Sequence, residues 1–230
     1  MSPVIIARNL HYKYEDGTVA LAGVDFDLFP GETVAVFGGN GSGKTTFVLH
    51  LNGLLDGQGT IEVCGLPVRG ETLKQVRQKI GIVFQDPDDQ LFMPSVLEDV
   101  AFGPLNLGTP PDQAVERARI ALDQVGMLEH QHKAPYHLSA GEKKRVAIAG
   151  VLAMDPEVLV LDEPTTFLDP PGQRSLTVLL RGLPQSKLIV THDVEFARSL
   201  SKRAVFFEKG RIAGDGPTDR IIEQFRWIGL

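Results

Sequence analysis

The sequence predicts an α/β fold built on a largely parallel sheet, and two patterns lead to this prediction. Short apolar runs typical of buried strands recur along the chain, at residues 33–37, 80–84, 158–161 and 188–190. Stretches of helical character lie between them, at residues 45–51, 113–125, 142–153 and 174–180. Buried strands that alternate with helices favour a parallel sheet that is covered on both faces.

The N-terminal part of the chain has a different pattern. Residues 24–28 alternate between apolar and polar side chains, as in a half-buried strand. The first thirty residues and residues 59–68 contain or follow turn pairs at Asp16-Gly17 and Asp56-Gly57, which predicts antiparallel strands there. Residues 103–111 are rich in glycine and proline and are expected to link a helical insertion to the rest of the chain.

Composition excludes several classes of protein. The chain has 230 residues, of which 43% are hydrophobic and 23% charged, so a disordered or fibrous chain is excluded. A net charge of −6 argues against a basic face that coats nucleic acid. One cysteine, Cys64, excludes a disulfide framework and is expected to be a small packing residue in a strand. With no apolar run near the roughly 18 residues of a membrane span and no visible export signal, a soluble cytosolic chain is expected.

Residues 38–45 carry the strongest chemical motif, the pattern G-x-x-x-x-G-K-[ST] between a predicted buried strand and a predicted helix. Its glycines allow a tight turn that directs N–H groups at phosphate oxygens, and the helix start adds its positive end. Lys44 is expected to reach the β- and γ-phosphates of ATP, and the Thr45 hydroxyl to bind Mg²⁺. The residues predicted to bind ATP here are Gly38, Gly39, Asn40, Gly41, Ser42, Gly43, Lys44, Thr45 and Thr46.

A second motif is the predicted strand at residues 158–161, which is followed directly by Asp162 and Glu163. Strand ends at one edge of a parallel sheet converge on the ligand crevice. Asp162 is therefore expected to hold Mg²⁺, through water, and Glu163 to act as the general base on the attacking water. Two acidic residues after a strand can also cap a helix, and it is the phosphate loop that favours the catalytic interpretation.

A third motif lies at residues 138–145, where Ser139 and Gly141 precede the apolar helix predicted after them. A serine and a glycine at a helix start can form an anion site. On its own, however, the segment is more typical of an ordinary capped helix.

With these three motifs in order, the chain resembles the ATP-binding subunit of an ABC transporter over nearly its whole length. The resemblance implies an ABC ATPase fold, a P-loop NTPase with a mostly parallel core sheet, an N-terminal antiparallel β subdomain and an α-helical subdomain. Residues 1–84 and 155–230 would form the nucleotide-binding core, and residues 85–154 the helical lobe with the signature helix. The implied activity is ATP hydrolysis, with Mg²⁺, coupled to transport.

The resemblance also implies roles for single residues. Ser139 and Gly141 lie in a segment similar to the ABC signature, which contacts the γ-phosphate bound to the opposite protomer. Gln85 resembles the Q-loop glutamine that touches Mg²⁺ and senses the membrane partner. Asp169 lies in a segment that resembles the D-loop, which crosses the dimer interface. A second ATPase subunit, identical or paralogous, would complete an ATP sandwich.

His192 resembles the switch histidine that contacts the γ-phosphate and Glu163. The implied catalytic pair is therefore Glu163 and His192, and the implied Mg²⁺ ligands are Thr45, Gln85 and Asp162. Tyr14 resembles the aromatic residue that stacks on adenine, with Tyr12 as a second candidate. Three positions depart from the family pattern. Gly39 stands near a place where a proline is common, Ala140 stands where a glycine is usual, and Phe167 is bulkier than the usual residue.

A finer resemblance lies in residues 49–54, 84–94 and 98–104, which are similar to ATPases of energy-coupling-factor importers, especially the cobalt and nickel branch. The resemblance implies a transmembrane coupling protein and a small membrane subunit that captures the substrate. A coupling helix would dock beside the Q-loop and face Asp86, Asp88, Asp89 and Gln90. Many of these ATPases carry a further C-terminal segment for dimerisation beyond the position of Leu230, so an ATP-dependent rather than constitutive dimer is expected.

The function expected from sequence is an ATPase subunit, peripheral at the cytoplasmic face of the membrane, that powers uptake of cobalt or nickel without binding nucleic acid. A vitamin such as biotin remains an alternative cargo, because an ATPase subunit does not touch the cargo. A soluble ABC ATPase of translation or DNA maintenance is the alternative class, which usually shows tandem cassettes or basic surfaces.

Several other residues have simpler interpretations. His130, His132 and His137 lie close together, but they lack the spacing of a metal site and are expected to be solvated. The charged residues 142–145 are expected to form a solvated helix face rather than a nucleic-acid patch. Residues 113–125 are expected to form an ordinary amphipathic helix of the helical lobe.

Overall fold

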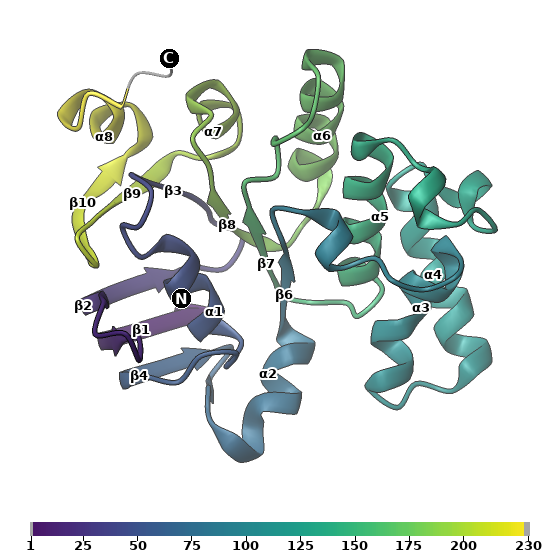
Figure 1. Ribbon diagram of the computed structural model, residues 1–230, viewed down its shortest axis with the longest axis horizontal. Helices are drawn as coiled ribbons and strands as arrows, with labels where there is room; N and C mark the ends of the chain where they lie inside the picture. The colour runs from purple at the N-terminus through teal and green to yellow at the C-terminus, as the bar shows by residue number, and fades with distance from the viewer. Residues whose placement is uncertain (1, 228–230) are drawn as a thin grey trace.

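A six-stranded sheet forms the centre of the protein in the computed structural model, which describes residues 2–227 (Figure 1). Its strand order is β10-β9-β3-β8-β7-β6. All neighbours from β9 to β6 are parallel, and only β10 is antiparallel to β9, which confirms the mostly parallel core sheet. The strands are β3 (Thr33–Gly38), β6 (Ile80–Val83), β7 (Val158–Asp162), β8 (Ser186–Val190), β9 (Arg203–Glu208) and β10 (Arg211–Pro217).

A second, antiparallel sheet comes from the N-terminal part, as predicted, with the order β2-β1-β4-β5. Its strands are β1 (Ile5–Lys13), β2 (Val19–Leu28), β4 (Gln58–Val63) and β5 (Leu66–Pro67). Helix α1 (Lys44–Leu51) packs against β2, β3 and β4, and so joins the two sheets. Its Phe47 and Leu51 are fully buried there.

The alternation of side chains along β3 explains how the layers are arranged. Val34 and Val36 belong to a core shared with α1 and the antiparallel sheet. Ala35 and Phe37, one residue later in each case, point to the other face and pack with α7 (Val194–Leu200) and α8 (Thr218–Gln224). One face of the large sheet is therefore covered mainly by the second sheet and α1, and helices cover the other.

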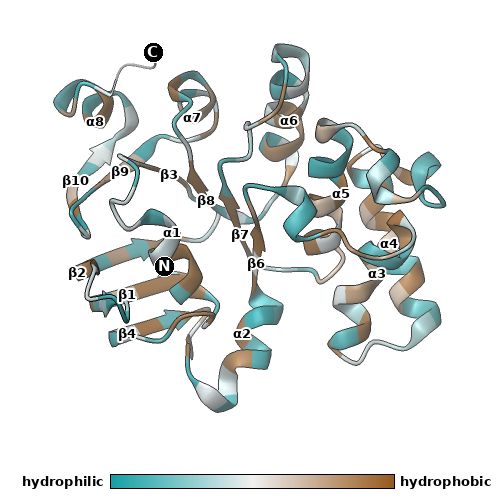
Figure 2. Cartoon of the chain, in the orientation of Figure 1, coloured by the Kyte–Doolittle hydropathy of each residue, from teal (hydrophilic) through white to brown (hydrophobic). Residues whose placement is uncertain are grey.

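The helical part packs beside β6 and β7, at the end of the sheet away from β10 (Figure 1). It contains α3 (Val96–Asn106), α4 (Pro111–Gln124) and α5 (Ala140–Leu152). Figure 2 shows apolar residues concentrated on the central strands and polar residues on the outer sides of these helices. The amphipathic helix predicted at 113–125 is thus confirmed as α4. The remaining helices are α2 (Leu73–Lys79) and α6 (Pro170–Gly182).

The linker predicted at residues 103–111 is wrong over its first half. Gly103 and Pro104 lie inside α3, which continues to Asn106. A β-carbon on Gly103 would come 2.8 Å from the sulfur of Met154, so the glycine lets α3 pack closely against this side chain. Pro104 is buried in the last turn, where the hydrogen bond that it removes interrupts little of the helix.

Cys64 is also placed differently from its prediction. It lies in the turn between β4 and β5, with a positive φ of 51°, and not within a strand. It nevertheless packs against the main core, as a small apolar residue does. Within residues 2–227 there is no helix with both the length and the apolar character required to cross a membrane.

Candidate active site

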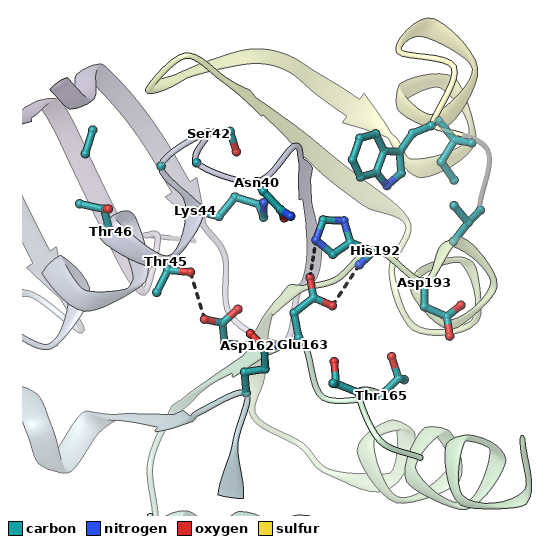
Figure 3. Close-up of a pocket in the computed structure, with 18 of the residues that line it drawn as sticks. Asn40, Ser42, Lys44, Thr45, Thr46, Asp162, Glu163, Thr165, His192 and Asp193 are labelled. Carbon is teal, nitrogen blue, oxygen red and sulfur yellow. Dashed lines mark hydrogen bonds and ion pairs between the residues drawn. The ribbon is translucent and has the colours of Figure 1, made fainter. Parts of the chain in front are cut away.

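An open pocket of about 1600 Å³ lies at the carboxyl ends of β3, β7 and β8 (Figure 3). These strands are neighbours in the sheet, so the residues that follow them meet although they are far apart in the sequence. The phosphate loop follows β3, Asp162 ends β7 with Glu163 directly after it, and His192 follows β8. The structure therefore brings the predicted loop, acidic pair and histidine to one place.

The loop between β3 and α1 is shaped by glycines in positive-φ conformations. At Gly43, φ is 107° and a β-carbon would lie 2.4 Å from the carbonyl oxygen of Ala20, so no other residue fits. The buried Lys44 donates hydrogen bonds to the carbonyls of Gly38, over 2.7 Å, and Gly39, over 2.9 Å. Residues 40–46 line the pocket, whereas Gly38 and Gly39 contribute through these carbonyls.

Burial lowers the pKa of Lys44, although the nearby carboxylates Glu163 and Asp162 act in the opposite direction. The Lys44 ammonium group lies between a Gly-rich loop and two carboxylates. It is suited to bind an anion, whose negative charge would balance its positive charge in the pocket. The start of α1 at Lys44 contributes the positive end of the helix to the same point.

Thr45 and Asp162 meet across the pocket floor. The Thr45 hydroxyl donates to Oδ2 of Asp162 over 3.3 Å, as Figure 3 shows. Burial raises the pKa of Asp162, and the Thr45 hydrogen bond and the charge of Lys44 oppose this change. A hydroxyl and a carboxylate are the hard oxygen ligands that Mg²⁺ prefers, so the donor set fits this ion. Gln85, also predicted as a ligand, lines the same pocket from the end of β6.

Glu163 has an unusual backbone for a residue with a side chain, with a φ of 43°. Its N–H donates to the carbonyl of Val190 over 2.9 Å, which fixes the residue against β8. Strained conformations of this kind persist where the surrounding structure over-determines them, and they cluster at active sites. The backbone thus directs the Glu163 carboxylate into the pocket.

His192 lies close to both oxygens of the Glu163 carboxylate (Figure 3). The backbone N–H of His192 donates to Oε2 over 3.2 Å, and the imidazole Nε2 lies 3.0 Å from Oε1. Burial raises the pKa of Glu163 to about 7, with the His192 hydrogen bond opposing and Asp162 adding to the rise. Burial, followed by the charge of Lys44, lowers the pKa of His192.

Two buried oxygens in the pocket lack a donor or acceptor with hydrogen-bonding geometry within the described chain. They are Oγ of Ser42, in the phosphate loop, and Oε1 of Glu163, for which the nearby Nε2 is poorly directed. Buried polar atoms without partners are rare in folded proteins. Both positions suit a polar ligand, such as a phosphate oxygen at Ser42 and a water at Glu163.

Tyr14, the predicted adenine-stacking residue, is at the rim of the pocket with 39% of its surface exposed. Its hydroxyl is 3.0 Å from Oγ1 of Thr46, so the ring is held beside α1. Tyr12 is less exposed and packs edge-on against His50, with ring centroids 4.8 Å apart. Among the two candidates, only Tyr14 lines the pocket.

Ser139, Gly141 and Asp169 are not brought to this pocket by the described chain. Ser139 caps α5 in a capping box with Glu142, and its Oγ accepts from the Glu142 N–H over 3.3 Å. Asp169 caps α6 by accepting from the N–H of Gly172 over 2.8 Å. The interpretation of residues 138–145 as a capped helix is therefore correct for the single chain.

The prediction that residues 142–145 form a solvated face is wrong for Lys144, which is only 1% exposed. Its ammonium group donates to the backbone carbonyls of Gln85, over 2.6 Å, and Phe84, over 3.3 Å. Burial lowers the pKa of Lys144 to about 8. Lys143, the residue before it in α5, pairs with Asp88 over 2.6 Å. The helix predicted to be solvated is thus tied to residues 84–88 instead.

The histidines show no metal cluster. His130 pairs with Glu142 over 2.9 Å, and the His137 ring stacks edge-on with Tyr136. Across residues 2–227, no group of three or more histidine, cysteine or acidic side chains is arranged to hold a metal ion.

Several pocket residues were not predicted from sequence. Thr165 and Thr166 come two and three residues after Glu163, and Asp193 follows His192, so their proximity in the sequence to predicted residues is a usable signal. Thr18 and Ala20 belong to the segment after Tyr14, which brings them to the same rim. The remaining residues come from α6 to α8 and the segment after them, and no local motif marks them: Gln173, Val194, Glu195, Arg198, Ile222, Arg226 and Trp227.

The chain is similar to several known proteins in sequence and in structure. A family model described as ABC transporter matches residues 21–166. An energy-coupling factor transporter ATP-binding protein, EcfA, of Methanothermobacter thermautotrophicus is 48% identical over 93% of this chain and 70% of its own length. The structure of CbiO1 from Clostridium perfringens, described as part of the ABC transporter complex CbiONQ, is similar with a TM-score of 0.86 and 38% identity, covering 98% of this chain and 92% of its own.

A third similar structure is a dimeric ATP-binding cassette in a post-hydrolysis state, bound to ADP and phosphate. It has a TM-score of 0.83 and 26% identity, and the match covers 93% of this chain and 98% of that cassette. The predicted fold, a P-loop NTPase with a helical subdomain, is confirmed by this likeness and by the sheets described above.

Proposed function

The chain belongs to the ABC transporter family as an ATP-hydrolysing, ATP-binding subunit, and from that premise we propose that it powers an energy-coupling-factor importer for a transition metal ion, cobalt or nickel. One observation carries the enzymatic part of the proposal. The phosphate loop, Asp162, Glu163 and His192 converge on one pocket, with two buried oxygens left for a polar ligand.

Each residue has a role that follows from its surroundings. Lys44 and the N–H groups of the loop bind the phosphates of ATP, and Tyr14 offers a ring at the pocket rim for adenine. Thr45, Asp162 and Gln85 would hold Mg²⁺, which supplies charge neutralisation at the phosphates when it is bound. Glu163 orients the attacking water and accepts its proton, since its pKa near 7 suits a base at neutral pH. His192 holds the Glu163 carboxylate.

The second protomer would complete the site. Ser139, Gly141 and Asp169 are separate from the pocket of their own chain, and Ser139 and Asp169 are exposed. In an ATP sandwich, Ser139 and Gly141 would contact the γ-phosphate held by the partner, and Asp169 would lie at the interface. Closure then depends on the bound nucleotide, and hydrolysis reopens the dimer. In this proposal residues 85–154 act as the helical lobe and the rest as the nucleotide-binding core.

The coupling-factor type is supported by the EcfA relative and by exposed residues that follow Gln85 in the sequence. Phe92 and Phe102 stack edge-on, with centroids 5.0 Å apart, and both are exposed, at 62% and 37%. Asp86 and Asp89 are exposed close by in the sequence, whereas Asp88 is paired with Lys143. An apolar pair with acidic neighbours suits a helix of a transmembrane coupling protein that carries apolar and arginine side chains.

The metal cargo is supported by the likeness to CbiO1 and by the residues at 84–94. The chain would act at the cytoplasmic face of the membrane, together with a coupling protein and a small substrate-capture subunit, and would not bind nucleic acid. A vitamin such as biotin is the alternative cargo, and a soluble non-transport ABC ATPase is the alternative class.

Affinity purification of the tagged protein from detergent-solubilised native membranes tests the proposal. Recovery of a coupling protein together with a small membrane subunit is the expected result, and bound cobalt or nickel in that subunit would identify the cargo. A vitamin in the same subunit would contradict the metal proposal. Recovery of soluble partners alone, from protein that hydrolyses ATP, would overturn the transporter assignment.

A further inference from the structure

The aromatic ring of Trp227 lies against His192, in a part of the pocket for which the sequence gives no motif. The indole and imidazole centroids are 5.6 Å apart and the ring planes are tilted by 31°. Ring centroids at this separation are in the range of packed aromatic pairs. Both residues line the nucleotide pocket, so this contact is part of the site itself.

Trp227 is itself held by a buried aromatic cluster. Its ring lies edge-on to Phe206, at 5.3 Å and 76°, and 6.4 Å from the ring of Phe37. Phe206 and Phe37 are 7% and 0% exposed, so they form a fixed surface on β9 and β3. The backbone N–H of Trp227 also donates to the carbonyl of Ile222, over 2.9 Å, which fixes the main chain that carries the ring. The indole is therefore anchored to the central sheet rather than lying loosely at the pocket.

The imidazole of His192 has few other constraints. Its side chain is 44% exposed, and within the described chain its only polar side-chain contact is Glu163, where Nε2 is 3.0 Å from Oε1. A single contact at one ring atom leaves the imidazole free to turn about its χ angles. A second ring packed against the imidazole removes much of that freedom.

We propose that Trp227 is a positioning residue, which holds the imidazole of His192 on the carboxylate of Glu163 and so keeps the general base aligned with the attacking water. The proposal rests on the role assigned above to His192. It adds the segment after α8 to the catalytic apparatus, through contact with His192 and not through contact with the reacting atoms. Arg226, with a φ of 49°, turns the backbone from α8 towards this position.

The simpler alternative is that Trp227 only fills space beside β9. Phe225 provides a matched control for this alternative, because it stacks on the same Phe206, with centroids 4.0 Å apart and planes 4° apart. Phe225 is not among the residues that line the pocket within the described chain. Loss of either ring removes packing from one cluster, but only Trp227 contacts His192.

The test compares Trp227→Ala, Trp227→Phe and Phe225→Ala by steady-state hydrolysis over a range of Mg-ATP concentrations. Trp227→Ala is expected to lower kcat about tenfold with KM nearly unchanged, because misplacement of a catalytic group affects the transition state most. Trp227→Phe should recover most of kcat, and Phe225→Ala should retain it. An unchanged kcat in Trp227→Ala, or an equal loss in Phe225→Ala, would overturn the proposal.

A spectroscopic measurement covers the case in which Trp227→Ala does not fold. The chain contains one tryptophan, so 5-fluorotryptophan labelling gives a single ¹⁹F resonance. His192→Ala should shift this resonance, and an unshifted resonance would refute the ring contact. The same variant tests the role of His192 separately: hydrolysis at the wild-type rate would remove His192 from the mechanism, whatever the resonance shows.

Discussion

The buried ammonium group of Lys144 donates a hydrogen bond of 2.6 Å to the backbone carbonyl of Gln85. The two residues belong to different parts of the site: Lys144 is in α5, which begins at the signature segment, and Gln85 lines the nucleotide pocket. A neighbouring contact, from the Gln90 amide to the carbonyl of Ala147 over 3.2 Å, joins the same two segments. A displacement at Gln85 is therefore expected to move α5.

Replacement of Lys144 tests the connection between Gln85 and α5. Lys144→Met keeps the length of the side chain but leaves the carbonyls of Gln85 and Phe84 without their donor. Stability should fall by about 1–3 kcal/mol, the cost of unsatisfied buried groups, and ATP hydrolysis should fall as well. Lys143→Met is the matched control, because its pair with the exposed Asp88 should contribute at most about 1 kcal/mol. Urea unfolding measures both, and equal losses would contradict the prediction.

Glu163→Gln removes the proposed general base while it keeps the size of the side chain. ATP binding should be retained, and the rate of hydrolysis should fall by a factor of about 100 or more. Single-turnover hydrolysis and nucleotide binding by equilibrium dialysis separate the two effects. Near-normal turnover would remove Glu163 from the mechanism.

Lys44→Ala should act on binding rather than on the chemical step alone. The ammonium group is buried among backbone carbonyls of the loop and faces the pocket, so its loss leaves the phosphates without their nearest cation. ATP affinity, measured by calorimetry, is expected to weaken at least about tenfold, in line with a lost charge-assisted contact. Unchanged affinity would show that Lys44 does not bind the phosphates.

Phe92→Ser and Asp89→Ala should disturb coupling to the membrane partner but not basal hydrolysis. Both residues are exposed and neither lines the nucleotide pocket in the described chain. Metal uptake in cells is therefore expected to fall while the ATPase rate of the purified chain stays within about twofold of wild type. Ile120→Ser, at a residue of α4 that is 52% exposed, is the control for loss of an apolar surface group. Wild-type uptake in Phe92→Ser would exclude this docking surface.

Cys64 should react slowly with thiol reagents. Burial raises the pKa of the thiol to about 12, with the negative charge of Glu157 adding to the effect. The thiolate is the reactive form, so labelling of the folded protein near pH 8 should be far slower than that of the unfolded chain. The pKa of the thiol is higher in the folded state than in the unfolded state. Its contribution to the free energy of unfolding is therefore lost as the pH rises from about 9 towards 12. Rapid labelling at pH 8 would contradict the burial.

The parts of the fold that depend on local patterns could be predicted from the sequence. The buried runs that became β3, β6, β7 and β8 are short, apolar and bounded by polar or turn residues, so their type follows from the residues alone. Helices α2, α3, α7 and α8 were not predicted. Three of them have only seven residues, so their stability comes from packing, and α3 contains Gly103 and Pro104, which were interpreted as a linker.

The site shows the same division. The phosphate loop and the acidic pair are recognisable from fixed residue spacings. The sequence therefore predicted that Lys44, Thr45, Asp162 and Glu163 share one site, and all four line the pocket. Lys144 and Trp227 belong to no motif of fixed spacing. Lys144 is one lysine in a charged run and Trp227 follows a short helix, so their roles are seen only from the contacts that they make across the fold. Ser139 and Asp169 do not line the pocket of their own chain within the described residues, so the dimer roles that the resemblance implies for them stay predictions.

The position of β3 in the central sheet has a consequence for synthesis of the protein. This strand carries the phosphate loop, yet its two neighbours are β8 and β9, which belong to the last quarter of the chain. A ribosome-bound chain that has released only the loop and α1 therefore has no partner strands on either side of β3, and no His192 in the pocket. Nascent chains should accordingly remain unable to retain ATP until translation has passed β9, which ties the appearance of nucleotide binding to the completion of the sheet.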